Sequence, residues 1–490
     1  MKVQHVLFIV GLMLPALGAK AQEDPEFEAY RRQSESEYKT FSDKEKSDFA
    51  AFRAKANAEY AAFVEQSWQE MQAMAAIPVP ESSKPKTPPL NRSVVQPLGP
   101  APLSFSDVVP LPAEPKPIDV PDIELTLEAE SDAMEEVDFF ATKIVVRIAR
   151  KVVLAKLASL AEKEVARVWR YFSRGTHDGL LKSCMEQRRR YDLCDWAYFQ
   201  LCGSAAEKVF GRQCNEAVLL QSFLLTQSGY RIRMAENSGN LVLLAPFDHT
   251  VYNYPYLNID GMKYYVLGKA KSTTYRVCKA VFPRERTASI CIRRLPSLSV
   301  ESTKPRTFVG GRYPNMKATM TVNRNLMAFY SRYPVSSAWD AYAHTSLSKE
   351  TKSSLYPALR SQLEGLSERK QVDMLLDFVQ NAFEYKIDQD QFGYERPLFG
   401  DESFYYPFND CEDRSILFAI LVHDLVGLDV VLVHWPGHLA TAVAFSEEVD
   451  GDYFTLKEKH YTVCDPTYIG ASPGETMPQF QAVPAKLVSL

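Results

Sequence analysis

An eleven-residue repeat near the amino terminus constrains the fold of this 490-residue chain more than any other feature. Aromatic and apolar side chains recur in two columns, and nearly every position between them is charged, Ser, Gln or Ala. Eleven residues make three turns at about 3.67 residues per turn, so both columns stay on one face of a single helix. The columns are Phe27, Tyr38, Phe49, Tyr60 and Met71, and Tyr30, Phe41, Phe52 and Phe63.

The repeat predicts one long helix over residues 22–77. Its aromatic face needs a covering surface, because large exposed apolar patches are uncommon on soluble proteins. A coiled coil between copies of the chain is the favoured cover, which makes residues 22–77 a predicted homo-oligomer contact. The alternatives are that the helix lies on a membrane surface or along its own protein.

The first residues predict export. Met1-Lys2 supplies a positive charge, residues 6–18 form an apolar stretch, and Ala19-Lys20-Ala21 offers small residues at a cleavage site. This pattern is typical of a secretory signal peptide over residues 1–21, so we expect a periplasmic or secreted mature chain. The apolar stretch is too short to span a bilayer, and we expect no transmembrane segment in the mature chain.

Composition narrows the class of protein. Hydrophobic residues make up 46% of the chain and aromatic residues 12%, which excludes global disorder. A net charge of −5 on a chain of this length predicts no nucleic-acid partner. The length itself favours two or three domains over one core.

Eight cysteines are present, and export changes how they are interpreted, because disulfides persist outside the cytosol. Pairing is expected among six of them, although the sequence does not select the connectivity. No spacing typical of zinc ligands occurs, so no metal site and no cofactor are predicted. The six are Cys184, Cys194, Cys202, Cys214, Cys278 and Cys291.

The remaining chain is predicted to be α+β throughout. Residues 78–121 are rich in proline and predict an extended spacer that holds the globular part away from the helix. A middle α+β domain is expected over 122–300, opening with a basic amphipathic helix over 139–172. Residues 301–350 are a connector, and 351–490 form the last domain.

The middle domain is predicted to contain a helix over 216–227 and strands over 241–245, 250–256 and 263–267. Cys214 precedes the helix, Asp248-His249 opens a strand, and Asp260 precedes the next one. This order of Cys, His and Asp echoes the last domain. It predicts a second, degenerate copy of that domain without catalytic activity.

The last domain carries the residues with catalytic potential. After a helical stretch over 355–383, Cys411 stands at the start of a helix, where unpaired N–H groups favour a thiolate. Asp410 and its acidic neighbours would raise the thiol pKa if they faced it, unless they cap the helix. His438 opens one strand and Asp465 ends the next. A cysteine nucleophile needs a base, and the base needs an acceptor that fixes its tautomer.

Three blocks in this order resemble the signatures of the transglutaminase-like superfamily: Asp410-Cys411-Glu412-Asp413-Arg414-Ser415, Pro436-Gly437-His438 and Cys464-Asp465-Pro466-Thr467-Tyr468. The resemblance covers residues 355–490 and implies a papain-like fold. It implies Cys411 as nucleophile, His438 as general base and acid, and Asp465 as the orienting carboxylate. The Cys411 N–H would be one oxyanion donor, and Gln391 is suggested as the second. Calcium dependence stays open.

The resemblance predicts an exported cysteine peptidase or amidase that acts on a peptide or protein, or an acyltransferase that crosslinks proteins. Hydrolysis is favoured, because water is always present while a crosslinking enzyme must exclude it. Competing interpretations are a disulfide between Cys411 and Cys464, and His434 in place of His438. The alternative function is a non-catalytic oligomeric scaffold or binding protein.

Overall fold

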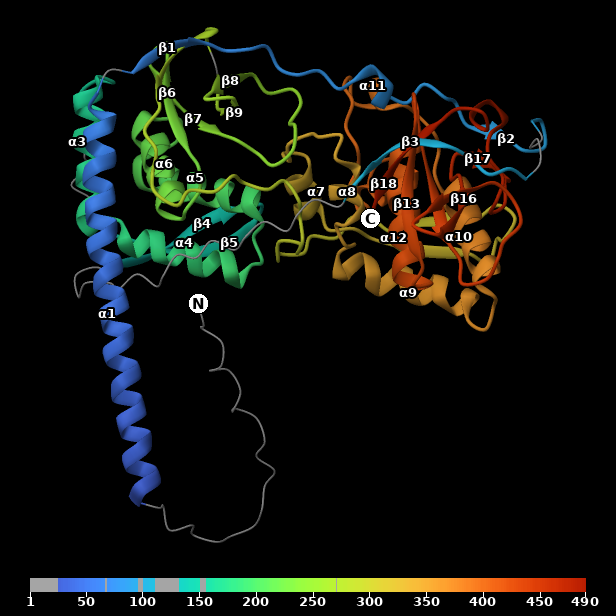
Figure 1. Cartoon of the computed structure of the whole chain (residues 1–490), viewed down its shortest axis with the longest axis horizontal. Coiled ribbons are helices and arrows are strands. Elements are labelled where there is room, and N and C mark those ends of the chain that lie inside the picture. Colours follow the sequence, from blue (N-terminus) through green and yellow to red (C-terminus); the bar gives the residue numbers. More distant parts are fainter. Residues whose placement is uncertain (1–24, 67, 96–99, 111–131, 150–155, 270) are drawn as a thin grey trace. The chain divides into compact units, whose positions relative to one another are not determined.

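The computed structural model describes residues 25–490 except 67, 96–99, 111–131, 150–155 and 270 (Figure 1). It forms two units, one ending at Arg53 and one spanning Ala54–Leu490. Helices and strands are mixed, so the predicted α+β class is confirmed. The predicted signal peptide over residues 1–21 lies outside the described residues. None of the described helices combines the length and apolar character that crossing a membrane requires.

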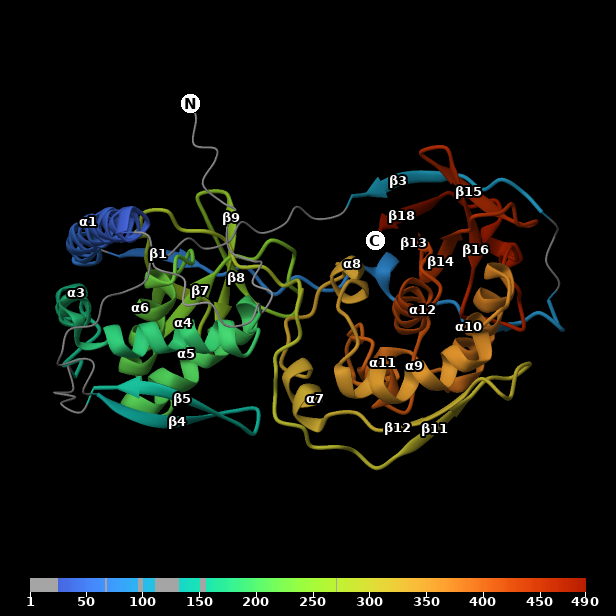
Figure 2. The ribbon, with the colours of Figure 1, turned by 90° about the horizontal axis from the view of Figure 1, so that it is seen from below.

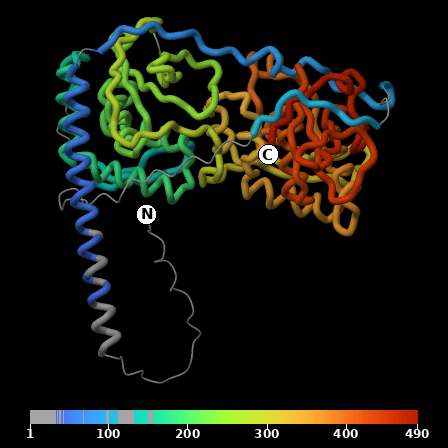
Figure 3. Tube along the Cα trace, in the orientation of Figure 1, coloured from blue at the N-terminus to red at the C-terminus, as the bar shows by residue number. Residues whose placement is uncertain are grey.

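The predicted long helix is present as α1 (Pro25–Val64), drawn in blue in Figures 1 and 3 where its placement is certain. Its extension to residue 77 is wrong. Met71, the last member of the repeat, lies in strand β1 (Gln69–Gln72), which pairs with β10 (Thr274–Cys278). The sheet satisfies the backbone groups of β1, and a local helical repeat carries no information about such a tertiary partner.

The carboxyl-terminal part of α1 packs on its own protein. Tyr60 is buried, with its ring centroid 4.4 Å from that of Trp169 and 5.8 Å from that of Phe282. Asn57 accepts a hydrogen bond from Trp169 Nε1 at 3.2 Å. Here the helix follows the alternative in which it lies along its own protein. For Phe41, which is 60% exposed, the contact between copies stays a prediction.

The middle region contains an antiparallel six-stranded sheet in the order β1-β10-β6-β7-β9-β8 (Figure 2). The predicted helix over 216–227 is α6, which packs against β7. The predicted strand over 250–256 is wrong, because only Tyr256 of it belongs to a strand. The other bounds are β6 (Arg233–Asn237), β7 (Asn240–Ala245), β8 (Tyr256–Ile259), β9 (Met262–Leu267), α3 (Glu162–Tyr171), α4 (Asp178–Arg190), α5 (Asp195–Phe210) and α6 (Asn215–Gln227).

The single basic helix expected over 139–172 is wrong in its first part. The chain forms a hairpin of β4 (Ala133–Phe139) and β5 (Thr142–Ile148), and α3 begins only at Glu162. Ile144 and Ile148 are both buried on β5. A spacing of four residues fits one face of a helix and one face of a strand equally well, so the pattern did not separate the two.

The carboxyl-terminal region holds a second six-stranded sheet in the order β15-β16-β14-β13-β18-β3. Helix α12 packs against β13, β14 and α10. The helical stretch expected over 355–383 is two helices that break at Gly365, where φ is +76°. The bounds are α9 (Lys349–Leu363), α10 (Glu368–Ala382), α11 (Asp388–Gln391), α12 (Cys411–Leu425), β13 (Asp429–Trp435), β14 (His438–Ala444), β15 (Tyr453–Leu456), β16 (Lys459–Cys464), β17 (Tyr468–Ile469) and β18 (Ala485–Ser489).

The described parts of the proline-rich stretch over 78–121 do not act as a spacer, so that prediction is wrong. β3 (Phe105–Val109) pairs in parallel with β18, and β2 (Leu90–Asn91) pairs with β17. Proline has no backbone N–H to donate, so within sheets it is confined largely to edge strands. This proline-rich stretch accordingly contributes only short strands at sheet edges.

The connector expected over 301–350 also has structure of its own. It contains β11 (Arg306–Val309), β12 (Lys317–Met320), α7 (Arg324–Tyr330) and α8 (Trp339–Ala343).

The two six-stranded sheets share one order of elements. In each, a helix (α6 or α12) leads into two adjacent antiparallel strands, and the last strand pairs with the first of these. Two further strands form a hairpin whose second member pairs with the second strand. The sixth strand, β1 or β3, comes first in the chain and lies at the edge beside the last strand, antiparallel in one sheet and parallel in the other. This shared order is what the predicted second copy of the domain requires.

All eight cysteines are free thiols in the structure, so the disulfides expected among six of them are absent. Cys278 and Cys291, two of the six, lie in different surroundings. Cys278 is buried in β10, whereas Cys291 lies beside Asp248.

A buried histidine predicts how stability responds to acid. Burial lowers the pKa of His177 to about 4, and its ring lies 4.9 Å from that of Phe172. The unfolded state therefore binds more protons than the folded state between about pH 6.5 and 4, so stability is lost as pH falls through this window. We expect a loss of about 3 kcal/mol in this window that His177→Phe abolishes, measured by denaturant unfolding. The exposed His423→Phe is the control, and an unchanged pH dependence in His177→Phe would contradict this assignment.

Candidate active site

Cys411 is the first residue of α12, as the sequence predicts, and it is only 1% exposed. Its Sγ donates to Glu412 Oε2 at 3.1 Å, and the Leu439 N–H at the start of β14 points at the same sulfur. The helix start and the strand start therefore meet at this thiol. Since the first N–H groups of a helix have no partner within it, the Cys411 N–H remains suited to the predicted oxyanion role.

His438 and Asp465 form a buried pair. His438 Nε2 lies 2.8 Å from Asp465 Oδ2, and the side chains are 0% and 1% exposed. Asp465 Oδ1 accepts from the Thr467 N–H at 2.8 Å, which fixes the carboxylate. The ring of Phe480 stacks on that of His438 at 5.0 Å. His438 Nδ1 is buried without a hydrogen-bond partner, so this nitrogen remains available to a neighbouring group.

The environment of Cys411 opposes its ionisation. Burial raises the pKa of the thiol well above its usual value, and the charge of Asp410 raises it further. The Leu439 N–H acts in the opposite direction. Asp413 caps the helix by accepting from the Asp410 N–H at 3.2 Å. Both effects considered from the sequence are therefore present: Asp413 caps the helix, and Asp410 raises the pKa of Cys411.

Arg414 holds the site together, and sequence reasoning assigned it no role. Its buried guanidinium donates to the carbonyl oxygens of Phe383 at 2.7 Å and Gln380 at 3.2 Å. Gln380 Nε2 in turn donates to the Asp465 carbonyl at 3.1 Å. The arginine inside the signature block was the available signal, because a charged side chain between predicted core elements needs hydrogen-bond acceptors.

The other candidates lie elsewhere. Gln391 Nε2 donates to the Phe408 carbonyl at 3.3 Å, so its role as an oxyanion donor stays a prediction. Cys464 is a buried free thiol directed at the Thr462 carbonyl, and no disulfide joins it to Cys411. His434 Nε2 lies 2.9 Å from the Ser82 carbonyl instead of beside Asp465.

Four buried carboxylates lie next to the thiol: Asp388, Glu395, Asp410 and Glu412. One oxygen from each falls within 4.8 Å of the others. Within the described part of the chain, no ion pair involves any of the four. Burial raises the pKa of all four carboxyls, and neighbouring carboxylates contribute next for Asp388, Asp410 and Glu412.

Several oxygens of this acidic cluster have no hydrogen-bond partner: Asp388 Oδ1, Glu395 Oε1, Glu412 Oε1 and both oxygens of Asp410. The Asp413 N–H points toward the Asp410 carboxyl in a capping box, but it does not form a hydrogen bond with either of its oxygens. Buried like charges at this spacing repel strongly, so the cluster requires protons or a cation. Oxygen-only donors suit Ca²⁺, which takes about six to eight oxygen ligands.

Calcium is therefore expected to stabilise the protein. Adding about 100-fold more Ca²⁺ than the dissociation constant should contribute about 2.7 kcal/mol, seen as a rise in melting temperature that EDTA reverses. Glu412→Gln should lose most of this rise, whereas the exposed Glu364→Gln should keep it.

A melting temperature that does not change when Ca²⁺ is added would contradict a bound cation. It would indicate that the carboxyls of the cluster hold protons instead. In that case the folded state binds more protons than the unfolded state, and stability should fall as pH rises.

The corresponding positions of the middle region hold different residues. Asn215 starts α6 as Cys411 starts α12, and Asn240 starts β7 as His438 starts β14. Asn215 Oδ1 accepts from the Leu241 N–H at 2.8 Å, matching the contact of Cys411 with the residue after His438. The prediction that Cys214, His249 and Asp260 correspond to Cys411, His438 and Asp465 is therefore wrong, because Asn215 and Asn240 stand at the equivalent starts of the helix and the strand.

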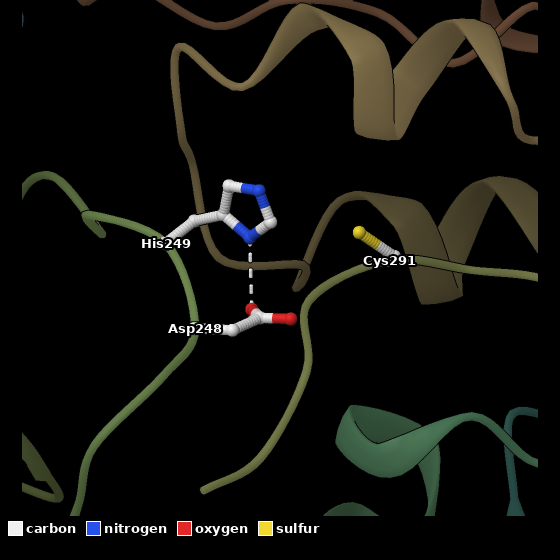
Figure 4. A group of neighbouring side chains, drawn as sticks. All are labelled: Asp248, His249 and Cys291. Atoms are coloured by element: carbon white, nitrogen blue, oxygen red, sulfur yellow. Dashed lines mark hydrogen bonds and ion pairs between the residues drawn. The ribbon is translucent and has the colours of Figure 1, made fainter. Parts of the chain in front are cut away.

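His249 instead belongs to a local group with Asp248 and Cys291 (Figure 4). His249 Nδ1 lies 2.9 Å from Asp248 Oδ1, and Cys291 comes from a neighbouring segment. Burial raises the pKa of Cys291 to about 12. The group also lies outside the positions that correspond to Cys411 and His438, which hold Asn215 and Asn240.

Comparison with protein-family models, with curated proteins and with solved structures finds no match to this chain. The resemblance to the transglutaminase-like superfamily therefore rests on the residues of the three blocks alone.

Proposed function

We propose that residues 351–490 form a transglutaminase-like cysteine site that cleaves amide bonds of a peptide or protein. The observation that supports this most is the buried hydrogen bond of 2.8 Å between His438 Nε2 and Asp465 Oδ2. Because Nε2 is held by the carboxylate, the unpartnered Nδ1 is the nitrogen that can take the proton of Cys411.

The reaction proceeds by acyl transfer. Cys411 Sγ attacks the amide carbon while its proton passes to His438 Nδ1. The carbon–nitrogen bond breaks as His438 returns the proton to the leaving amine, and a thioester remains on Cys411. Water or an amine then attacks the thioester, with His438 again as the base. The N–H of Cys411 stabilises the oxyanion.

Water is the proposed acceptor, which makes the protein an amidase or peptidase. A water molecule is always present, whereas transfer to an amine requires its exclusion. Amine transfer, giving a crosslinking acyltransferase, is the second outcome of the same thioester. Export through residues 1–21 belongs to this proposal and rests on the sequence pattern.

A non-catalytic scaffold is the second candidate function, because one observation favours it. Burial and Asp410 raise the pKa of Cys411, so the described state holds a neutral thiol and not a ready nucleophile. The exposed Phe41 on α1 would then serve assembly of several copies.

Hydroxylamine trapping tests the thioester for both acceptors at once. Incubation with a digest of a soluble protein should yield hydroxamates, and Cys411→Ala should abolish the yield. His438→Ala should lower it by about 10³-fold and Asp465→Asn by about 10²-fold or more, because each removes a partner in proton transfer.

The matched control is Cys464→Ala, which removes a buried thiol next to Asp465 and should leave the hydroxamate yield within about twofold of wild type. A yield that survives Cys411→Ala, or no yield from any form of the protein, would favour the scaffold.

A further inference from the structure

Residues 82–87 of the proline-rich stretch lie across the turn that precedes His438. The Gly437 N–H donates to the Ser82 carbonyl at 2.9 Å, and the Lys86 N–H donates to the Gly437 carbonyl at 2.9 Å. His434 Nε2 also contacts the Ser82 carbonyl at 2.9 Å. The segment is therefore held by main-chain hydrogen bonds directly beside the proposed base, as an extended peptide is held at a strand edge.

The other end of this segment lies on the side of the nucleophile. Tyr385 OH donates to the Thr87 carbonyl at 3.2 Å. The same phenol is close enough to Cys411 for the thiolate charge to raise the pKa of Tyr385, after burial as the main cause. Residues 82–87 thus run from the turn before His438 to a residue that neighbours Cys411.

Side chains of the segment match what lies beneath them. Pro85 is buried, whereas Pro88, just outside the segment, is exposed. A Cβ on Gly437 would lie 3.0 Å from Lys86 Cβ, so this approach requires the glycine. Lys84 is within electrostatic range of Glu395 in the acidic cluster. Lys84 and Lys86 also both pair with Glu81 of the same stretch, so the closest fit between segment and site is the buried proline and the main chain.

We propose that residues 82–87 lie over the path by which a peptide substrate reaches Cys411, so that the chain's own segment slows access to the site. This proposal deepens the proposed function and rests on it. It explains why Cys411 and His438 are only 1% and 2% exposed although a substrate must reach them. It also names the substrate class: an extended, proline-containing peptide like Lys84-Pro85-Lys86-Thr87.

Tethering makes the segment a strong competitor. It is anchored on one side by β1 and on the other by Arg92, which pairs with Glu475 at 2.7 Å. A segment held at both ends has an effective concentration on the order of millimolar, so a free peptide of equal affinity displaces it poorly. Displacement by a partner or cleavage of the segment would therefore switch the site on.

Limiting labelling with iodoacetamide, mapped by mass spectrometry on the full chain, tests the proposal. Pro85→Asp places a charge in a buried position of the segment and should raise the labelling rate of Cys411 by about tenfold or more. Pro88→Asp, the same change at an exposed position, should leave it unchanged. Cys464, buried in the same domain, reports general loosening and should stay unlabelled in both variants.

A synthetic peptide of residues 80–90 supplies the reverse test. Added to the Pro85→Asp variant, it should slow the labelling of Cys411 again, and the same peptide carrying Pro85→Asp should not. Lys86→Pro is a second variant that keeps the test decisive if the aspartate disturbs folding. It removes the N–H that donates to Gly437, and one hydrogen bond corresponds to about a fivefold rise in labelling.

Unchanged labelling of Cys411 in both variants would overturn the proposal, and so would an equal rise for Cys464. Failure of the proposed chemistry is distinguishable from this. Suppose that Pro85→Asp exposes Cys411 but the variant forms no hydroxamate. The segment then covers the thiol, but the site does not catalyse acyl transfer and the segment does not occupy a substrate path. If labelling is unchanged while wild type forms hydroxamate, the chemistry stands and the self-inhibition fails.

Discussion

The hydrogen bond between His438 and Asp465 is the interaction on which the rest of the site depends. It joins the start of β14 to the residue after β16, two strands that are neighbours in one sheet. The sheet holds these two chain positions together whatever the surface loops do, and α12 then brings Cys411 to the same edge. Arg414 of α12 donates to the Pro466 carbonyl in the turn after Asp465 and to the Phe383 carbonyl at the end of α10, so it ties α12 to both. Side chains placed by packed elements hold their geometry better than side chains on loops.

Electrostatics sets the state in which this site rests. Four buried carboxylates surround the start of α12, and a helix start by itself would favour the thiolate. Burial of the thiol, and after it the charge of Asp410, outweigh this local effect, so the pKa of Cys411 is raised instead of lowered. A cation in the acidic cluster would offset the contribution of Asp410, and under the proposal for residues 82–87 their removal would open the path to solvent. In the proposed function, the chemistry of this site is therefore restrained in two ways, by the buried and acidic surroundings of the thiol and by residues 82–87.

Local patterns predicted much of the site, and tertiary pairing explains most of the errors. Cys411 at a helix start and His438 at a strand start follow from periodicity and turn residues, which are local signals. The edge strands β1, β2 and β3 were missed because their partners lie far away in the chain and their own sequences carry no strand pattern. Asp388 and Glu395 were missed for the same reason, since their proximity to Glu412 depends on packing alone. Asn215 and Asn240 became recognisable as counterparts of Cys411 and His438 only once the strand orders were compared.

The most direct measurement of the central claim is the alkylation rate of Cys411 by iodoacetamide in wild type, in His438→Ala and in His423→Ala, with mass spectrometry as the readout. The account predicts that His438→Ala slows alkylation of Cys411 by about tenfold or more, because the thiol loses its proton acceptor. The exposed His423, at the far end of the same helix, should have no effect. Equal rates in the three proteins would contradict the claim that Cys411, His438 and Asp465 act as one unit.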